Sequence, residues 1–403
     1  MKEADVIIQG AGASALATAV GLARGGLAVT LLDAAEVCAA PAPGSEPRHS
    51  VIDIVSERVL RHLGGWPFIT RDRTYPIEAL ELEDCNAAAH LTLSACEVGE
   101  TRLGHVVERG VIDRALRELF DALPQTRRLA TGPVRDIAAD RQRLTIHLED
   151  GQALTARLLV AADGDNSPLR RLAGIRWRRA GYGQDAVIAR IRTERPPGHT
   201  VRQRFCGDEP LTLLPLDEHE SALLWPVPRT RARRLLEADS SSFHHQLEIA
   251  SGALLGGIEA SSARQAQRLI RGRAERYIGP RLALVGNAAH TVHPLAAQAV
   301  NLSLLDAATL IECVLEAHSA GRDPGGIGPL RRYERRRRGS NARMQNGLDI
   351  TQWLFGAQAA PLPLLRGTGL RIAARLPRLR QALMTGLMGL HGDLPELARG
   401  PGV

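Results

Sequence analysis

Residues 5–33, DVIIQGAGASALATAVGLARGGLAVTLLD, decide the fold. The segment begins with a short β-branched run, which is typical of a buried parallel strand. It continues through a glycine turn into small and apolar residues at helical spacing, and a glycine pair ends that stretch. A second apolar strand follows and ends in an acid. This order predicts a βαβ unit, the core of a dinucleotide-binding fold.

The turn after the first predicted strand carries the pattern G-x-G-x-x-A at Gly10, Gly12 and Ala15. The first glycine permits a tight turn, the second lets a pyrophosphate approach the backbone, and the small third residue lets the helix pack on the strand. Asp33 ends the second strand, where a carboxylate can accept a hydrogen bond from a ribose hydroxyl. The pattern predicts a site for FAD or NAD; a glycine turn in an unrelated α/β protein is the simpler alternative.

The rest of the chain indicates that this nucleotide fold is interrupted and then resumed. Segments 75–100 and 181–230 alternate as antiparallel strands do, and segment 144–164 reads as a hairpin whose second strand ends at Asp163. An acid at the carboxyl end of a strand stands where open α/β sheets bind ligands. Segment 232–275 has a helical pattern, whereas a buried strand and a long helix follow near residues 282–318.

Composition sets the class of protein. The chain has 403 residues, 44% of them hydrophobic, which is enough for about two to three domains. Its net charge of +7 favours an anionic partner such as a pyrophosphate or a phospholipid surface, and 3% aromatic residues argue against nucleic acid. Five scattered cysteines argue against a disulfide framework and for a reducing compartment. With no signal-peptide pattern at the N-terminus, we predict a cytoplasmic protein.

Three segments occur in the order seen in class A flavoprotein monooxygenases, which this chain therefore resembles. They are the glycine motif, ADGDNSPLR at 162–170, and RLALVGNAAHTVHPLAAQAVNLS at 281–303. Within that class the chain most resembles the ubiquinone-biosynthesis hydroxylases. That likeness rests on PRHSVIDIVSERVLRHLGGW at 47–66, LGHVVERGVIDRAL at 103–116 and the tail GLMGLHGDLPELARG at 386–400.

The resemblance implies an α/β architecture: an interrupted Rossmann-type FAD domain, a mixed β-sheet substrate domain and a helical C-terminal tail. We expect the FAD domain at 1–74, 101–180 and 270–345, the substrate sheet at 75–100 and 181–269, and the helical region at 346–403. The cofactor would be FAD, reduced by NAD(P)H as a co-substrate without a domain of its own. One oxygen atom of O2 would go to an aromatic ring, most simply a prenylated phenol of ubiquinone biosynthesis.

The resemblance also implies roles for individual residues. Arg48 and Pro294 are the predicted catalytic residues, beside the flavin. The predicted cofactor-binding residues are Gly10, Gly12, Ala15, Asp33, Arg48, Arg109, Asp163, Gly286, Asn287, Pro294, Ala297, Gln298, Ala299, Val300 and Asn301.

Three of these positions depart from the family pattern. Asn287 stands where the family has an aspartate, and Ala297 and Ala299 stand where it has glycines. An amide keeps one acceptor but lacks the charge, at a cost of about 1 kcal/mol. An alanine forced to positive φ would cost roughly 1–2 kcal/mol. Two alternatives therefore remain open: a flavin monooxygenase of another aromatic pathway, or a pseudoenzyme that keeps the fold as a scaffold.

Two further patterns have a structural and a functional interpretation. His290 and His293 have a spacing that could bind metal, but the family uses this loop for flavin, so we predict no metal. The run RRYERRRR at 331–338 fits a solvated helix face, or else a patch for anionic lipid. Association with the membrane surface or with a biosynthetic complex is the corresponding expectation.

Overall fold

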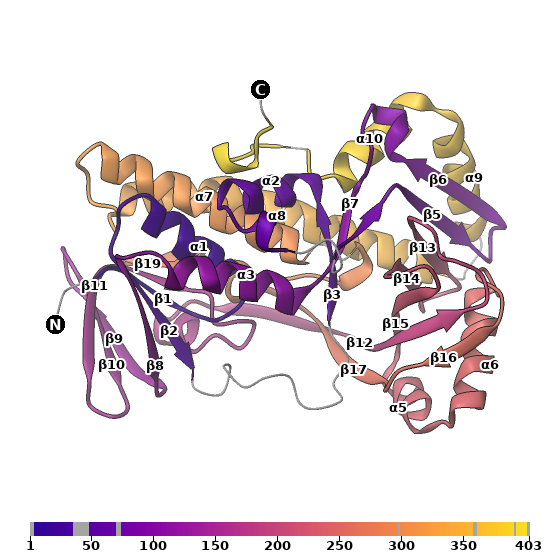
Figure 1. Cartoon of the computed structure of the whole chain (residues 1–403), viewed down its shortest axis with the longest axis horizontal. Helices are drawn as coiled ribbons and strands as arrows, with labels where there is room; N and C mark the ends of the chain where they lie inside the picture. Colours follow the sequence, from indigo (N-terminus) through magenta and orange to yellow (C-terminus); the bar gives the residue numbers. More distant parts are fainter. Residues whose placement is uncertain are drawn as a thin grey trace.

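The computed structural model describes residues 4–34, 48–69, 74–296, 299–357, 361–390 and 392–400. Three sheets and ten α-helices occur in these ranges (Figure 1). The helices are α1 (Ala13–Arg24), α2 (Ile54–His62), α3 (Arg109–Asp121), α4 (Pro168–Leu172), α5 (Arg229–Glu237), α6 (Ser240–Ser251), α7 (Ala299–Ser319), α8 (Ile327–Gly356), α9 (Leu362–Arg375) and α10 (Pro377–Leu387).

An eight-stranded sheet forms the nucleotide-binding half, and β1 lies at its centre. The strands of its main path run in the order β18-β19-β11-β1-β2-β8, and β10 and β9 continue from β11 as an antiparallel extension. Its strands are β1 (Ala4–Gln9), β2 (Val29–Ala34), β8 (Thr126–Thr131), β9 (Val134–Ala139), β10 (Leu144–Leu148), β11 (Ala153–Ala161), β18 (Ile278–Gly279) and β19 (Leu282–Leu284).

The opening segment forms the predicted βαβ unit. β1 pairs in parallel with both β2 and β11, so Val6, Ile7 and Ile8 are buried on both faces of the sheet. Helix α1 contacts α3 and α7, and small residues such as Ala15 and Ala19 allow that close packing. Strand β19, from far along the chain, pairs in parallel with β11. This pairing shows that the nucleotide-binding sheet is interrupted and resumed.

A nine-stranded mixed sheet forms the second half. Its main path runs β20-β17-β12-β15-β14-β13-β5-β6, with β16 beside β12. Its strands are β5 (Ala79–Asp84), β6 (Ala89–Ser94), β12 (Trp177–Thr193), β13 (Thr200–Phe205), β14 (Leu211–Pro215), β15 (Glu220–Pro228), β16 (Ile258–Ser261), β17 (Gln265–Ala274) and β20 (His290–Thr291). The long strands β12 and β17 extend from this sheet toward the nucleotide-binding half (Figure 1).

A three-stranded sheet, β3 (His49–Asp53), β7 (Gly104–Glu108) and β4 (Thr74–Ile77), completes the strands, with β7 in the middle. Beyond the sheets, α9 and α10 pack on β6. The predicted fold class is confirmed: α/β, with an interrupted nucleotide-binding sheet, a mixed second sheet and a helical C-terminal region. The predicted domain boundaries stay a prediction.

Two expectations from the sequence were wrong. The helical pattern over 232–275 ends early: α6 stops at Gly252 (φ 64°), and the chain then forms strands β16 and β17. Pairing with β12, a partner distant in sequence, overrides the local pattern.

The expectation of no disulfide also fails, because Cys85 and Cys206 are bonded. They follow the paired ends of the parallel strands β5 and β13, which spacing along the sequence could not show. In the described part of the chain, no helix is both long and apolar enough to cross a bilayer.

Candidate functional site: a nucleotide turn and a flavin-type loop

The β1–α1 turn has the geometry of a pyrophosphate cradle. Gly10 has φ 142°, and a Cβ there would lie 2.3 Å from the carbonyl oxygen of Ala162, so only glycine fits. A Cβ on Gly12 would meet no atom within 4 Å. Gly12 is the N-cap of α1 and gives it no side-chain cap. The open space in front of a helix N-terminus is where an anion is stabilised.

Two acids stand at the carboxyl ends of β2 and β11, the parallel strands on either side of β1. Asp33 is buried at the end of β2. Asp163 follows β11, and its Oδ2 accepts from the backbone N–H of Leu169 at 3.2 Å. Its Oδ1 is buried and has no hydrogen-bond partner among the described residues. Burial raises the pKa of Asp163. A buried acceptor without a partner fits a ligand that donates a hydroxyl or N–H group.

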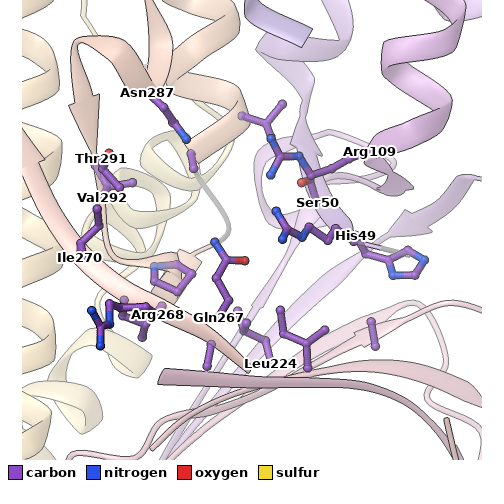
Figure 2. A pocket seen from close by; sticks show the side chains of 18 of the residues that line it. His49, Ser50, Arg109, Leu224, Gln267, Arg268, Ile270, Asn287, Thr291 and Val292 are labelled. Carbon is purple, nitrogen blue, oxygen red and sulfur yellow. The ribbon is translucent and has the colours of Figure 1, made fainter. Parts of the chain in front are cut away.

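Between the two halves lies a cavity of about 330 Å³. Six of the predicted residues line it: Arg48, Arg109, Asn287, Pro294, Ala299 and Val300. Figure 2 shows Asn287 on one side, Arg109, Ser50 and His49 on another, and Gln267 between them above the sheet. The loop after β19, strands β3 and β17, and the start of α3 therefore converge on one space.

Arg48 and Arg109 form the basic wall of the cavity. The backbone N–H of Arg109 donates to the carbonyl oxygen of Arg48 at 2.8 Å, where β3 and α3 begin. Burial lowers the pKa of the Arg109 guanidinium; Asp113 opposes this shift and Arg48 adds to it. Two adjacent guanidinium groups favour a ligand with negative charge in this part of the cavity.

Gly286 fixes the start of the altered loop. Its φ is 61°, and a Cβ there would lie 2.9 Å from Ser14 Oγ and 3.0 Å from Ser303 Oγ. The loop is thus pressed between the beginnings of α1 and α7. The next residue, Asn287, faces the cavity (Figure 2) and supplies a neutral amide where the resemblance implies a carboxylate.

Asp306, on α7, anchors this loop from behind and was missed by the sequence reasoning. Its Oδ2 accepts from His290 Nε2 at 2.6 Å and from the backbone N–H of Gly286 at 3.2 Å. Its Oδ1 accepts from Arg337 Nε at 2.7 Å and Asn341 Nδ2 at 2.9 Å. Burial alone would raise its pKa, but His290 and Arg337 hold the pKa of Asp306 at about 2. The loop is therefore tied to α8 through one buried carboxylate.

The two histidines do not point to a common metal. His290 is bonded to Asp306. His293 Nδ1 accepts from the backbone N–H of Leu295 at 3.2 Å, and its ring meets Tyr182 edge to face. Burial lowers the pKa of His293 to about 4, so its imidazole is neutral near pH 7. Each histidine thus holds a part of the loop in place.

The remaining predicted residues are distributed as follows. Ala299 is the first residue of α7, so it belongs to a helix and not to a turn that would require a glycine. Asn301 bonds to β3, its Nδ2 donating to Val51 O at 3.0 Å and its Oδ1 accepting from the N–H of Asp53 at 3.3 Å. Ala297 and Gln298 lie outside the described residues.

The residues present fit FAD. An open cradle at Gly12, an acceptor without a partner at Asp163, and a cavity with a basic wall lie along the region from β1 to the altered loop. His49, Ser50, Gln267 and Arg268 also line the cavity, although the sequence reasoning did not select them. No local motif marks them, since they reach the cavity only through the pairing of β3 with β7 and of β17 with β12.

The arginine run 331–338 is divided by the fold. Arg337 is buried on Asp306, and Arg336 pairs with Glu312 and Asp393. Arg332 pairs with Glu316. The other three, Arg331, Arg335 and Arg338, line a shallow groove with Arg273 and Glu334. Three of the six arginines in the run therefore have acidic partners.

Comparisons with known proteins identify the family of the chain. The family described as FAD binding domain matches residues 3–346. The chain is 33% identical to the 3-demethoxyubiquinol 3-hydroxylase of Escherichia coli, over 96% of this chain and 98% of that protein. It is 33% identical to the ubiquinone hydroxylase UbiL of Rhodospirillum rubrum, over 99% of this chain and 93% of that protein.

A solved structure shows the same fold. The p-nitrophenol 4-monooxygenase PnpA of Pseudomonas putida superposes with a TM-score of 0.77 at 16% identity, covering 100% of this chain and 99% of that one. The family match spans most of the chain, and the relatives match nearly end to end. The chain therefore belongs to the FAD-binding domain family of flavin-dependent monooxygenases, in the branch that contains the ubiquinone hydroxylases.

Proposed function

We propose that the chain hydroxylates a prenylated phenol of ubiquinone biosynthesis, with electrons from NAD(P)H and one oxygen atom from O2. The observation that carries this proposal is the cavity, because its two sides differ in chemistry. Arg48, Arg109 and Asn287 stand on the nucleotide side, whereas Ile188 and Leu224 belong to the opposite sheet. Such a space suits a ring with polar substituents and an apolar tail.

When bound, FAD would supply the redox chemistry that activates O2 and transfers an oxygen atom to the ring. The chain's own residues would bind and orient the two ring systems. Arg48, Arg109, Asn287 and Pro294 would lie beside the flavin. Apolar side chains of the sheet such as Ile188 and Leu224 would exclude water from the reacting ring, because they offer no hydrogen-bond partners.

Gln267 would orient the substrate. Its side chain lies between Asn287 and Leu224 in Figure 2, in the space where the two sides of the cavity face each other. An amide can donate to one phenolic oxygen or accept from one phenolic hydroxyl. Gln267 is thus placed to set which ring carbon is presented to the flavin.

A membrane-borne substrate leads to a further part of the proposal. A prenylated phenol partitions into the bilayer, so we propose that the chain works at a membrane surface, alone or with other enzymes of the pathway. In support, it has an excess of arginine, with 51 basic residues against 44 acidic ones.

The test is oxygen consumption by the FAD-saturated protein with NADH or NADPH, using a prenylated phenol and the same phenol without its tail. We expect substrate-dependent consumption and a hydroxylated product, with a lower KM for the tailed compound. The Gln267→Leu variant should lose product more than the Gln265→Leu variant, which changes a neighbouring glutamine outside the cavity lining. Absence of product from every prenylated phenol, with flavin bound, would overturn the proposal.

The neutral Asn287 favours a second candidate, a scaffold that has lost the chemistry. The oxygen-consumption assay with the FAD-saturated protein distinguishes the two candidates. A scaffold would show no flavin-dependent turnover on any aromatic, whereas a monooxygenase of another pathway would hydroxylate a phenol that lacks a prenyl tail. In a deletion strain, accumulation of a dehydroxy quinone precursor would support the first proposal.

A further inference from the structure

The outer side of α9 and α10 combines exposed apolar and basic side chains. Eleven large hydrophobic side chains are exposed among the described residues, and six of them lie between Leu364 and Leu383, on these two helices and at their junction. Leu364 and Leu365 are 71% and 61% exposed. Helix α9 lies at the upper right edge of the molecule in Figure 1. Exposed apolar residues concentrated in this way mark an interaction site.

Charge in this region has one sign. From residue 350 to residue 392 the sequence contains five arginines and no aspartate or glutamate. Arg366 is buried on Asp84, and Arg380 pairs with Glu97, both on the side that faces the sheet. Arg371, Arg375 and Arg378 are exposed and make no ion pair within the part of the chain that the structure describes. Three cations thus stand among leucines without a compensating acid.

The inner side of the same helices packs on the substrate half. Ala373, Met384 and Met388 form one apolar cluster with Leu91 and Leu93 of β6. Leu214 and Ala222 belong to this cluster and also line the cavity. The helices are therefore amphipathic elements, anchored on the sheet that forms one side of the cavity.

We infer that the outer face of α9 and α10 is a docking surface for an anionic phospholipid bilayer. This outer face is defined by Leu364, Leu365, Arg371, Ile372, Arg375, Leu376, Arg378, Leu379 and Leu383. Leucines would enter the boundary between headgroups and acyl chains, and arginines would contact lipid phosphates. Charge complementarity selects this occupant, because the face has cations and no acids. The inference rests on the proposed function and names the surface through which the chain would reach its substrate. Lipid binding can nevertheless be measured separately from turnover.

The groove at Arg331, Arg335 and Arg338 is the competing basic surface. It contains Glu334, and its other lining residues are arginines, Gly339 and Ala342. It thus offers charge without a large apolar side chain that could enter the bilayer. Because binding to a bilayer uses both charge and the burial of apolar side chains, the outer face of α9 and α10 should bind an anionic bilayer more strongly than this groove.

The test is co-flotation of the full-length, FAD-supplemented protein with vesicles. Vesicles of phosphatidylcholine and phosphatidylglycerol in equal amounts should bind the protein, and vesicles of phosphatidylcholine alone should bind it weakly. The triple variant Arg371→Gln, Arg375→Gln, Arg378→Gln should lower the partition coefficient about a hundredfold, at about fivefold for each arginine. Leu365→Gln should lower it by up to about tenfold on its own.

Matched controls make the outcome specific. The triple variant Arg331→Gln, Arg335→Gln, Arg338→Gln removes the same charge and should lower binding far less. Ile249→Gln changes an equally exposed apolar residue on α6 and should leave binding unchanged. Circular dichroism and bound flavin check that each variant is folded.

Three results would overturn the inference. They are absence of binding to the anionic vesicles, loss of binding through the α8 arginines instead, and a concentration-dependent dimer that Leu365→Gln disrupts while lipid binding is absent. Turnover reports on a different claim. Lipid binding without hydroxylation would refute the proposed reaction and leave this surface intact, whereas hydroxylation without lipid binding would do the reverse.

Discussion

The two ends of the cofactor region are built by different means. At the β1–α1 turn the required geometry is local, because Gly10 has a backbone conformation and a neighbour, Ala162 O, that exclude any side chain. At residues 286–290 the geometry depends on Asp306, which joins Gly286, His290 and Arg337 across three elements. The sequence of this loop can therefore differ from the family pattern while the contacts of Asp306 that hold the loop in place remain.

The largest expected effect comes from breaking that support with Asp306→Asn. The substitution leaves Arg337 buried without its counter-charge, so the free energy of unfolding should fall by about 3–5 kcal/mol. The affinity for FAD should fall as well. Urea unfolding with and without FAD measures both. Arg332→Gln, at a partly exposed pair with Glu316, is the control and should cost no more than about 1 kcal/mol. Equal effects of the two variants would refute the role given to Asp306.

Asp53 should impose a pH dependence on the same end of the site. Its Oδ1 caps α2 by accepting from Ser56 N–H at 2.7 Å. Burial raises its pKa from 3.8 to about 7, although the bonds from Ser56 oppose this shift. Because the folded-state pKa of Asp53 is raised, the protonated carboxyl contributes stability that is fully present below pH 4. This contribution is lost as pH rises through 7.

Asp53→Asn keeps the cap and removes the charge. The variant should be more stable than the natural chain above pH 8, by at most about 4 kcal/mol, and should differ little below pH 4. Thermal unfolding across pH measures the difference. Asp239→Asn changes the exposed cap of α6, where hydrogen bonds from Ser242 lower the pKa, and should show no such gain. A pH-independent difference for Asp53→Asn would contradict the assignment.

At the other end, two glycine substitutions should separate folding from cofactor binding. Gly10→Ala forces strain and a clash with backbone, so it should destabilise the protein by at least about 1–3 kcal/mol. Gly12→Ala meets no protein atom, so it should fold normally but lose FAD affinity, because its methyl group occupies the cradle. Urea unfolding and FAD titration test the pair. Normal FAD binding by Gly12→Ala would place the pyrophosphate elsewhere.

The smallest expected effect is an increase in the affinity for FAD. Asn287→Asp restores a carboxylate at the cavity and should tighten FAD binding several-fold, about 1 kcal/mol. Ala299→Gly should change FAD affinity less, because Ala299 belongs to helix α7 and its position does not require a glycine. Titration of each variant by flavin fluorescence measures these differences. A gain from Ala299→Gly that exceeds the gain from Asn287→Asp would indicate that the methyl group obstructs the ring.

The sequence predicted the features that depend on neighbouring residues. The βαβ unit, the glycine turn and the strand that leads to Asp163 all follow from patterns within a few residues of one another. It did not predict Asp306 with Arg337, nor Gln267 at the cavity, because those positions acquire their partners only when distant strands and helices pack. The Cys85–Cys206 bond and strand β17 were missed for the same reason.

The most direct test of the central claim, that the altered loop still holds a flavin, is the visible absorption spectrum of the purified protein during FAD titration. We predict saturable binding, with the spectrum of oxidised flavin shifted from that of free FAD, and weaker binding in Asp306→Asn than in the natural chain. A spectrum that stays the sum of free FAD and protein at saturating cofactor, with the protein folded, would contradict the claim.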